Sequence, residues 1–402
     1  MSRFGPLIHA SRPRVVAALA ARLRDLDLAE DAFSEACAAA LTTWPGQPPR
    51  DPGAWLWRAA LRRALDARRR AAVRERAVLD PPSPEPTPEE ALMAHEPIPD
   101  ERLRLIFVCC HPALAADTRA ALTLKVVCGL STERLARAFF CAEPAMLQRI
   151  TRAKRKIAAA GVPFEVPGPA AWPERLEAVL TTLEVAYAQA YEDAALAGET
   201  AGFADEVLRL SGLLVELTPD EPEALGLAAL VRFAEARRPA RLDERGAMVP
   251  PERQDVALWR ADVIADGVAL LDRAARAGRS GPRQILAAIH ASHCARIEGR
   301  PTPWADIARL YDALMVVRPT AATAVNRAVA IGEARGAAAG LAALADVEGM
   351  AGWLPYQAAR AHLCALARRY GEAAEALGMA LRLGPAPAER LYLEQRLRAL
   401  EG

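Results

Sequence analysis

Apolar residues recur at helical spacing along most of the chain, whereas the alternating pattern that marks β-strands is rare. In the first block, 1–76, three such patterns follow one another, at 15–26, 28–41 and from 55 onward. Asp51-Pro52 precedes the last of them and supplies an N-cap and a proline at the first helical position. The chain is therefore predicted to be all-α and to begin with three helices.

A second helical block is predicted at 102–161. Its central helix covers 117–127 and ends at Gly129, and Ser131 can cap a short helix that follows. The last helix begins at Pro144. Its apolar stripe consists of Met146, Ile150, Ala153 and Ile157, and its opposite face consists of Gln148, Arg149, Arg152, Arg155 and Lys156. A short helix, a tight turn and a longer helix with a basic outer face predict a helix-turn-helix, whose last helix enters the major groove of DNA.

Repeated helix pairs are predicted to fill the rest of the chain, 174–402. The clearest pair spans 356–385, with small residues where the helices cross, an aromatic residue before the turn and a proline at the end. A weaker copy spans 319–344, and looser pairs occur around 174–191, 203–217 and 220–237. This pattern is typical of tetratricopeptide-like hairpins and predicts an α-solenoid, with irregular spacing between 240 and 300.

Charge is unevenly distributed along the sequence. The blocks at 1–76 and 102–161 carry net charges of +6 and +8, while 162–402 carries −6. Between the blocks, 77–101 carries −7 and is rich in proline, which predicts an extended linker. A second proline-rich stretch at 162–173 predicts a hinge. Such asymmetry indicates a polyanionic partner for the two basic blocks only.

Composition narrows the class of protein further. Of the 402 residues, 52% are hydrophobic and 25% are charged, as in soluble globular proteins. No apolar run approaches the length of a membrane span, and the N-terminus lacks the pattern of a signal peptide. Seven cysteines, an odd and sparse set, do not form a disulfide framework. We therefore expect a cytoplasmic protein with no membrane partner.

The long helix that begins at 52 carries a second cluster of basic residues. Six arginines lie along it: Arg58, Arg62, Arg63, Arg68, Arg69 and Arg70. Trp55 and Trp57 stand at its start, and aromatic residues beside arginines can stack unpaired bases. Two tryptophans at helical spacing are more often core residues, so this pattern alone favours core packing over base stacking.

Together these segments resemble a bacterial RNA polymerase sigma factor of the extracytoplasmic-function type, within the sigma-70 superfamily. The segment 25–36, DLDLAEDAFSEA, is similar to the helix with which that family binds core polymerase, and 51–66, DPGAWLWRAALRRALD, is similar to its −10 recognition and melting helix. The most specific match is 100–114, DERLRLIFVCCHPAL, which leads into the helix-turn-helix and 152–157, RAKRKI. This part resembles the −35-binding domain of the subgroup that carries a tetratricopeptide-like C-terminal extension.

The extension resembles that subgroup through 220–227, DEPEALGL, and through Gln254-Asp255 with Trp259. Relatives usually carry Phe-Asn-Glu-Gly-Tyr near the start of the extension, where this chain has YAQAY at 187–191. Val256 stands where relatives usually have arginine. We therefore do not transfer the roles of those polar positions to this chain.

The resemblance implies a region 2-like domain at 1–76, a region 4-like domain at 102–161, no cofactor, and core RNA polymerase and promoter DNA as partners. For core polymerase it implies contacts from Asp27, Leu28, Asp31, Ala32, Phe33 and Glu35. For the −10 element it implies Trp55, Trp57, Arg58, Arg62, Arg63, Asp66 and Arg69. For the −35 element it implies Gln148, Arg149, Arg152, Lys154, Arg155 and Lys156.

Other interpretations were weighed from the residues. Cys109, Cys110 and His111 lack the spacing of a zinc site, so a buried packing cluster is favoured. His290 and His293 share a helix face beside Cys294, and a half-buried face is favoured there over metal or sensor chemistry. No nucleophile triad, phosphate loop or paired-carboxylate cleft can be named from spacing, so an enzyme is not expected.

Two alternatives to a sigma factor remain at this stage. One is a stand-alone helix-turn-helix regulator that binds duplex DNA and uses its repeats as a sensing arm. The other is a scaffold whose repeats bind a protein partner. The segment 25–36 discriminates against the first, because a simple repressor does not need a polymerase-binding helix. For the extension we expect regulation of activity in cis.

Overall fold

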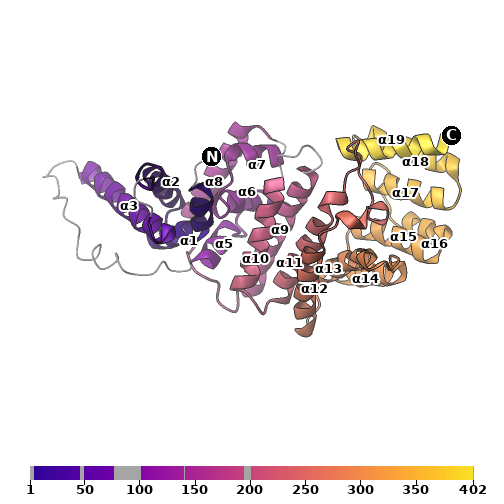
Figure 1. Ribbon diagram of the computed structural model, residues 1–402, viewed down its shortest axis with the longest axis horizontal. Coiled ribbons are helices and arrows are strands. Elements are labelled where there is room, and N and C mark those ends of the chain that lie inside the picture. The colour runs from indigo at the N-terminus through magenta and orange to yellow at the C-terminus, as the bar shows by residue number, and fades with distance from the viewer. Residues whose placement is uncertain (1–3, 46–48, 77–100, 140, 194–200, 402) are drawn as a thin grey trace. The chain divides into compact units, whose positions relative to one another are not determined.

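The computed structural model describes residues 4–45, 49–76, 101–139, 141–193 and 201–401 (Figure 1). Regular structure in these ranges is helical, apart from one isolated bridge between Leu242 and Met248. The prediction of an all-α fold is confirmed. The predicted linker, 77–101, lies outside the described residues except for its last position. Contacts divide the chain into two compact units, Met1–Gln189 and Ala190–Gly402.

The first block forms three helices, as predicted: α1 (Gly5–Leu23), α2 (Leu26–Thr43) and α3 (Pro52–Arg76). The side chain of Asp25 caps α2 by accepting a hydrogen bond from the Leu28 N–H at 3.0 Å. Asp51 caps α3 in the same way through the Ala54 N–H at 2.9 Å. Such caps satisfy backbone donors that the first turn of a helix leaves unpaired. Trp44 is fully buried at the end of α2.

The second block contributes α5 (Arg102–Cys109), α6 (Ala116–Val126), α7 (Thr132–Ala138) and α8 (Glu143–Ala159). Gly129 follows α6 with a φ of +77°, a conformation that glycine adopts without strain. The Ser131 hydroxyl accepts the Arg134 N–H at the start of α7. All four residues of the predicted apolar stripe on α8 are buried. The predicted order of helices and caps in this block is therefore confirmed.

The long helix α9 (Trp172–Asp193) packs against α5 of the first unit. The rings of Trp172 and Phe107 lie 5.3 Å apart, and Arg175 donates a hydrogen bond to the Phe107 carbonyl at 2.6 Å. From its pattern this helix is predicted to belong to the extension, because an amphipathic pattern shows that a helix buries one face but not which neighbour covers it. The contact boundary accordingly falls at Gln189 rather than at the hinge 162–173.

The second unit consists of consecutive helices, most of them paired as hairpins: α10 (Ala201–Leu217), α11 (Pro222–Ala236), α12 (Ala261–Arg276), α13 (Pro282–Cys294), α14 (Trp304–Val317), α15 (Ala321–Arg335), α16 (Ala337–Ala345), α17 (Leu354–Leu366), α18 (Tyr370–Arg382) and α19 (Pro387–Glu401). Separate apolar clusters join neighbouring pairs, centred on Phe233, Ile307, Leu363 and Leu377 in turn. Where α15 crosses α16, a Cβ on Gly340 would lie 2.7 Å from the Gly332 Cα, so only glycine permits this approach.

The irregular segment predicted between 240 and 300 follows the 3₁₀ helix Arg238–Ala240 and contains three more, Pro251–Arg253, Val256–Leu258 and Ala295–Glu298. Gln254 holds this segment in place. Its side-chain amide donates to the Val249 carbonyl at 2.9 Å and accepts from the Trp259 indole at 3.2 Å. The Gln-Asp motif of the extension thus has a structural role, because it satisfies polar groups around a buried tryptophan.

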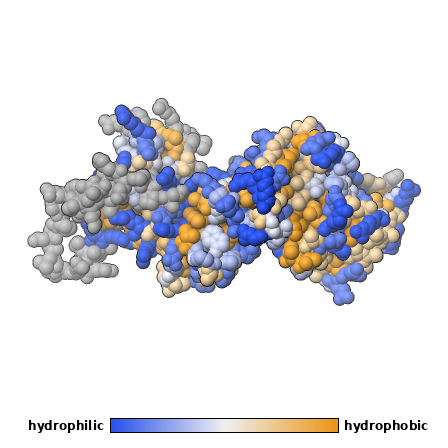
Figure 2. Space-filling view, turned by 90° about the horizontal axis from the view of Figure 1, so that it is seen from below, coloured by the Kyte–Doolittle hydropathy of each residue, from blue (hydrophilic) through white to orange (hydrophobic). Residues whose placement is uncertain are grey.

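The surface of the second unit mixes hydrophilic and hydrophobic residues on the face that Figure 2 shows. Val316 and Val317 at the end of α14, and Met379 and Leu383 on α18, are among its exposed apolar side chains. None of the described helices combines the length and the apolar character needed to cross a lipid bilayer.

Candidate nucleic-acid interface

Helix α8 presents one apolar and one basic face. Because its buried residues repeat every three or four positions, the residues between them are directed away from the block. Gln148, Arg152, Arg155 and Lys156 are exposed, and Arg149 is half-buried. Arg152 Nε donates to the Gln148 carbonyl at 3.3 Å, which aligns the guanidinium with the helix axis. Five of the six predicted −35 residues therefore lie on or beside one outward face.

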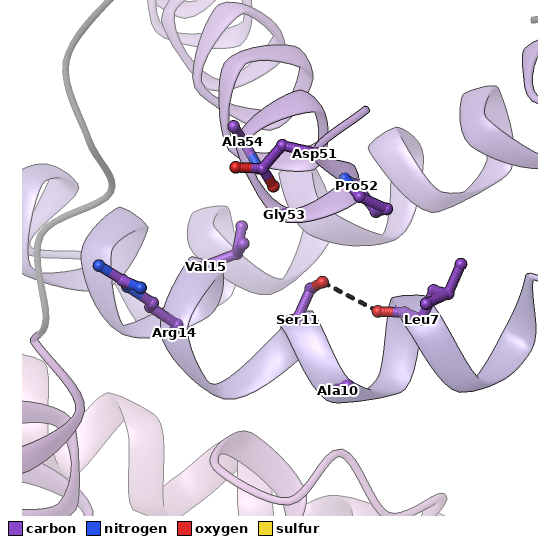
Figure 3. A pocket seen from close by; sticks show the side chains of 9 residues that line it. All are labelled: Leu7, Ala10, Ser11, Arg14, Val15, Asp51, Pro52, Gly53 and Ala54. Carbon is purple, nitrogen blue, oxygen red and sulfur yellow. Dashed lines mark hydrogen bonds between the residues drawn. The ribbon is translucent and has the colours of Figure 1, made fainter. Parts of the chain in front are cut away.

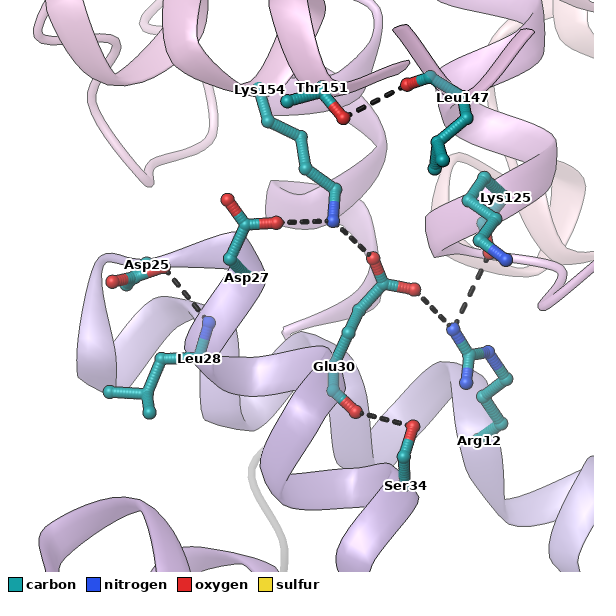
Figure 4. A network of polar contacts seen from close by, with 10 residues as sticks. All are labelled: Arg12, Asp25, Asp27, Leu28, Glu30, Ser34, Lys125, Leu147, Thr151 and Lys154. Carbon is teal, nitrogen blue, oxygen red and sulfur yellow. Dashed lines mark hydrogen bonds and ion pairs between the residues drawn. The ribbon is translucent and has the colours of Figure 1, made fainter. Parts of the chain in front are cut away.

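Lys154, the sixth residue of that set, is directed elsewhere. Its Nζ lies 2.6 Å from Asp27 Oδ1 and 2.8 Å from Glu30 Oε2, both on α2, and only 12% of its side chain is exposed (Figure 4). Burial disfavours the charged amine, but Glu30 and Asp27 outweigh this effect and raise the pKa of Lys154. In this structure Lys154 joins the two helical blocks, and its ammonium group is not presented with the other basic residues.

Glu30 is the centre of this network. It also accepts a hydrogen bond from Arg12 Nη2 at 2.6 Å, and Arg12 reaches the Lys125 carbonyl at 3.4 Å (Figure 4). Sequence reasoning did not single out Glu30 or Arg12. Its position in the sequence does indicate burial, because Glu30 falls in line with Leu26 and Phe33 on the apolar stripe of α2. An acid on an apolar stripe indicates a buried ion pair.

The exposed face of α2 is acidic. Asp31 and Glu35 are exposed, and Asp27 has 65% of its side chain exposed beside Lys154. Burial and the neighbouring Asp27 carboxylate raise the pKa of Asp31, although Lys154 acts in the opposite direction. Glu35 pairs with Arg63 of α3 at 3.1 Å.

The three apolar residues of α2 that are predicted to contact polymerase are less exposed than its acids. Ala32 and Phe33 are buried in the block, where the Arg12 guanidinium lies 5.3 Å from the centre of the Phe33 ring. Leu28 is half-buried. The side chains that α2 offers to another molecule are therefore mainly Asp27, Asp31 and Glu35.

Helix α3 separates its tryptophans from its arginines. Trp57 is only 6% exposed, and Trp55 is half-buried with its ring edge-on to Trp44, 5.6 Å between centroids. Arg58 and Arg62 are exposed. These positions show that the tryptophans pack the block while the arginines face outward.

Two further arginines of α3 are engaged within the block. Arg69 pairs with Asp66 at 3.5 Å, and Arg68 donates a hydrogen bond to the Leu23 carbonyl at the end of α1. Asp66 and Arg69, both predicted to contact the −10 element, are partly exposed. Along 52–70, where the side chains of α3 are described, its outward surface therefore carries Asp66 among several bases.

A pocket opens between α1 and the first turn of α3 (Figure 3). Nine residues line it: Leu7, Ala10, Ser11, Arg14, Val15, Asp51, Pro52, Gly53 and Ala54. The Asp51 carboxylate both caps α3 and lines the pocket, while the Ser11 hydroxyl donates to the Leu7 carbonyl at 2.8 Å. The pocket thus combines apolar walls with hydrogen-bonding groups. It lies at the N-terminal end of α3, the end that carries Trp55.

The cysteine and histidine clusters have structural partners. The Cys110 thiol lies 3.3 Å from the Thr123 hydroxyl, and His111 Nδ1 accepts the Ala113 N–H at 3.1 Å. His290 Nδ1 lies 2.9 Å from Arg237 Nη2, and because arginine only donates, this nitrogen is the acceptor. Over the described ranges, no group of three metal-binding side chains gathers at one place.

Comparison with known proteins identifies two segments of the chain. Residues 7–74 match the model of sigma-70 region 2, and residues 175–275 match a family described as of unknown function. The sequence is 40% identical to an uncharacterized protein of Rhizobium meliloti (strain 1021) over 406 residues, which covers 96% of this chain and 93% of that protein. No solved structure matches the chain.

The region 2 match covers α1, α2 and nearly all of α3, the helices that carry the predicted polymerase and −10 residues. Region 2 implies binding to RNA polymerase and recognition of promoters. Residues 7–74 therefore form a sigma-70 region 2 domain, and along nearly its whole length the chain belongs to the family of the Rhizobium meliloti protein.

Proposed function

We propose that the protein is a dissociable initiation subunit of bacterial RNA polymerase, of the extracytoplasmic-function type, which directs the core enzyme to a specific set of promoters. In this proposal α2 binds core polymerase, α3 stabilises the opened −10 element, and α8 reads the −35 element. The observation that carries the proposal is that one compact unit holds both a sigma-70 region 2 and a second block whose last helix has a basic outer face.

The geometry of α8 supports its role at the −35 element. The major groove admits one helix, and base edges and phosphates there require hydrogen-bond donors. Exposed Gln148, Arg152 and Arg155 supply amide and guanidinium donors, and the buried stripe leaves that face uncovered by its own block. The preceding α7 and its cap at Ser131 complete a helix-turn-helix arrangement.

The geometry of α3 supports contact with opened −10 DNA through its arginines. Arg58 and Arg62 point outward and suit phosphate contacts, which provide affinity that depends on salt. The buried Trp57 supports the helix from inside. Trp55 and the pocket at the start of α3 lie together at one end of the helix, where stacking and hydrogen bonds can hold an unpaired base.

The surface of α2 supports contact with core polymerase. Asp27, Asp31 and Glu35 form an exposed acidic row, and we propose that it meets a basic surface on the polymerase. The Glu35–Arg63 pair links the surfaces of α2 and α3, the two helices to which we assign polymerase and DNA binding.

For the second unit we propose regulation in cis through tetratricopeptide-like hairpins. Its apolar clusters and hairpins give it a core of its own, so it is not a simple spacer. An α-solenoid generally uses its concave surface for protein contacts. The net charge of −3 on residues 190–402 disfavours binding to DNA and favours docking on basic surfaces, whether of this chain or of polymerase.

The proposal is tested by association with purified core polymerase and with promoter DNA in separate assays. A sigma factor co-elutes with core polymerase in the absence of DNA, and it binds promoter DNA specifically only in the presence of core. A stand-alone regulator would bind duplex DNA by itself and would not co-elute with core, and that result would overturn the proposal.

A further inference from the structure

Two residues with opposite predicted tasks bind each other in this structure. Asp27 belongs to the set predicted for polymerase, and Lys154 belongs to the set predicted for DNA, yet they form an ion pair at 2.6 Å. Lys154 also reaches Glu30 at 2.8 Å. While this contact persists, Lys154 neutralises the Asp27 carboxylate at one end of the acidic row of α2, although 65% of the Asp27 side chain stays exposed.

A second contact lies beside the first. The Arg12 side chain of α1 passes over Gly129 at the end of α6, where a Cβ would lie 2.4 Å from Arg12 Cδ. From there it bonds to the Lys125 carbonyl and to Glu30. Glu30 therefore lies between one cation from its own block, Arg12, and one from the other block, Lys154.

The contact between the blocks is incompletely packed. A cleft opens beside the Lys154 pair, and residues of both blocks line it: Arg24, Asp25, Leu26, Asp27, Lys154, Arg155, Ile157, Ala158, Gly161, Val162, Pro163, Phe164 and Glu165. Desolvation offsets part of the attraction within a partly buried ion pair, yet here the carboxylates outweigh it and raise the pKa of Lys154. Release of Lys154 therefore requires a partner that supplies cations of its own to Asp27 and Glu30.

We propose that this contact is an autoinhibitory closure: in the free chain Lys154 of α8 occupies the Asp27 carboxylate of the polymerase-binding face of α2, and core polymerase binds that face only after Lys154 is released. The inference rests on the proposed function of α2. It assigns to Lys154 a role in controlling access to polymerase, distinct from the DNA contact that the sequence pattern predicts.

Because lysine is rare in this chain, cross-linking through lysine amines tests the proposal specifically. Only three lysines occur in the sequence, at 125, 154 and 156. A zero-length carbodiimide reagent joins an amine to a carboxylate that it already contacts, so the full-length chain should form an amide between Lys154 and Asp27 or Glu30. Peptide mass spectrometry identifies this link. Prior addition of excess core polymerase should reduce its yield at least fivefold, and the cross-linked chain should bind core at least tenfold more weakly than untreated chain.

Lys154→Arg provides the matched control, because arginine keeps the ion pairs but lacks the reactive amine. This variant should bind core normally after the same treatment, which separates the effect of the link from general damage by the reagent. A second variant, Lys154→Glu, should bind core several-fold more tightly than the wild type. Arg22→Glu, which makes the same charge change at an exposed position on α1, should not.

The outcomes separate this inference from the proposed function. Absence of the link in the free chain, or a linked chain that binds core as well as the untreated one, would overturn the closure while leaving the polymerase-binding role intact. If the untreated chain and Lys154→Glu both fail to bind core, the proposed function itself is overturned, and the closure with it.

Discussion

Lys154 and Asp27 lie 127 positions apart in the sequence, yet the amine of one and the carboxylate of the other are 2.6 Å apart. The pair connects the helix predicted to read DNA with the helix predicted to bind polymerase. Its existence means that the surfaces of the first unit are not independent. A change on one helix is expected to alter what the other can bind.

Reversal of charge on the outer face of α8 should weaken promoter binding alone. Arg149→Glu combined with Arg152→Glu removes two cationic contacts. The slope of the logarithm of the holoenzyme's promoter-binding constant against the logarithm of salt concentration should therefore fall in magnitude by about two. Binding to core in the absence of DNA should not change. Arg276→Glu with Arg279→Glu, on exposed positions of the second unit, is the charge-matched control for the salt titration. An equal loss of core binding in the α8 variant would argue against this assignment.

Reversal of charge on α2 should abolish association with core. Asp31→Arg with Glu35→Arg replaces two exposed acids, and the second change also breaks the pair with Arg63. Helix content measured by circular dichroism should stay unchanged, because both side chains point outward. Glu348→Arg with Glu375→Arg makes the same charge change far along the sequence and should co-purify with core normally. Persistent co-purification of the α2 variant would remove the main support for a polymerase-binding helix.

On α3, replacement of a tryptophan should lower stability, whereas replacement of an exposed arginine should slow promoter opening. Trp57→Ala should lower the free energy of unfolding of the first unit by roughly 3–5 kcal/mol, because it leaves a cavity in the packed block. Arg62→Ala should change that stability by less than ~0.5 kcal/mol, because Arg62 is exposed, but it should slow promoter opening. Chemical denaturation and permanganate footprinting of unpaired thymines measure the two effects. A stable Trp57→Ala protein would contradict the packing role.

A truncated chain should keep a folded first unit only if the truncation leaves α9 in place. A chain that ends at Pro167 loses α9 and uncovers Phe107, which Trp172 and Arg175 cover in the full protein. A chain that ends at Gln189 keeps this contact. We expect the 1–189 fragment to be folded and the 1–167 fragment to aggregate or unfold. Transcription by the 1–189 fragment should differ several-fold from that of the full chain, and identical activity would exclude regulation in cis.

The second unit should lose stability in mild acid. Burial, then the charge of Arg237, lowers the pKa of His290 well below its ordinary value, and the same two causes lower the pKa of His293 to about 3. The Glu252 carboxylate, 3.7 Å from His293 Nδ1, favours the charged ring, but burial and the neighbouring arginines outweigh it and the pKa of His293 is lowered. Both rings are therefore neutral in the folded chain, while in the unfolded chain they take up protons near pH 6.5.

Because the unfolded state binds more protons below that pH, the local free energy of unfolding around α13 should fall as the pH drops from about 6.5 toward 3. The loss should reach on the order of 1–2 kcal/mol per histidine at pH 5. Amide hydrogen exchange of α13, corrected for the intrinsic pH dependence, measures it. His290→Gln should make the free energy of unfolding around α13 less dependent on pH. An unchanged pH dependence would mean that other groups cause the effect.

Much of the first unit was predictable because its signals are local. Caps at Asp51 and Ser131, the glycine after α6 and the apolar stripe of α8 each follow from a few neighbouring residues, and the structure confirms them. The partners of α9 and of Lys154 were not predictable, since they depend on contacts between helices far apart in the sequence. Position on a helix shows which way a side chain points, but not what lies opposite.

The tryptophans of α3 show the same limit. For Trp55 and Trp57 the sequence pattern favours core packing, whereas the resemblance to sigma factors implies contact with the −10 element. Burial of Trp57 identifies it as a core residue, while half-buried Trp55 lies beside a pocket. Glu30, which the sequence reasoning did not single out, could have been found by its place on the apolar stripe of α2.

The central claim is that this chain directs core polymerase to specific promoters. Its most direct test is transcription in vitro with purified core polymerase, full-length chain and fragmented genomic DNA from the source organism, followed by sequencing of RNA 5′ ends. The account predicts a small set of start sites that share upstream −35 and −10 elements, and their loss with Asp31→Arg combined with Glu35→Arg. Start sites identical to those of core polymerase alone would contradict it.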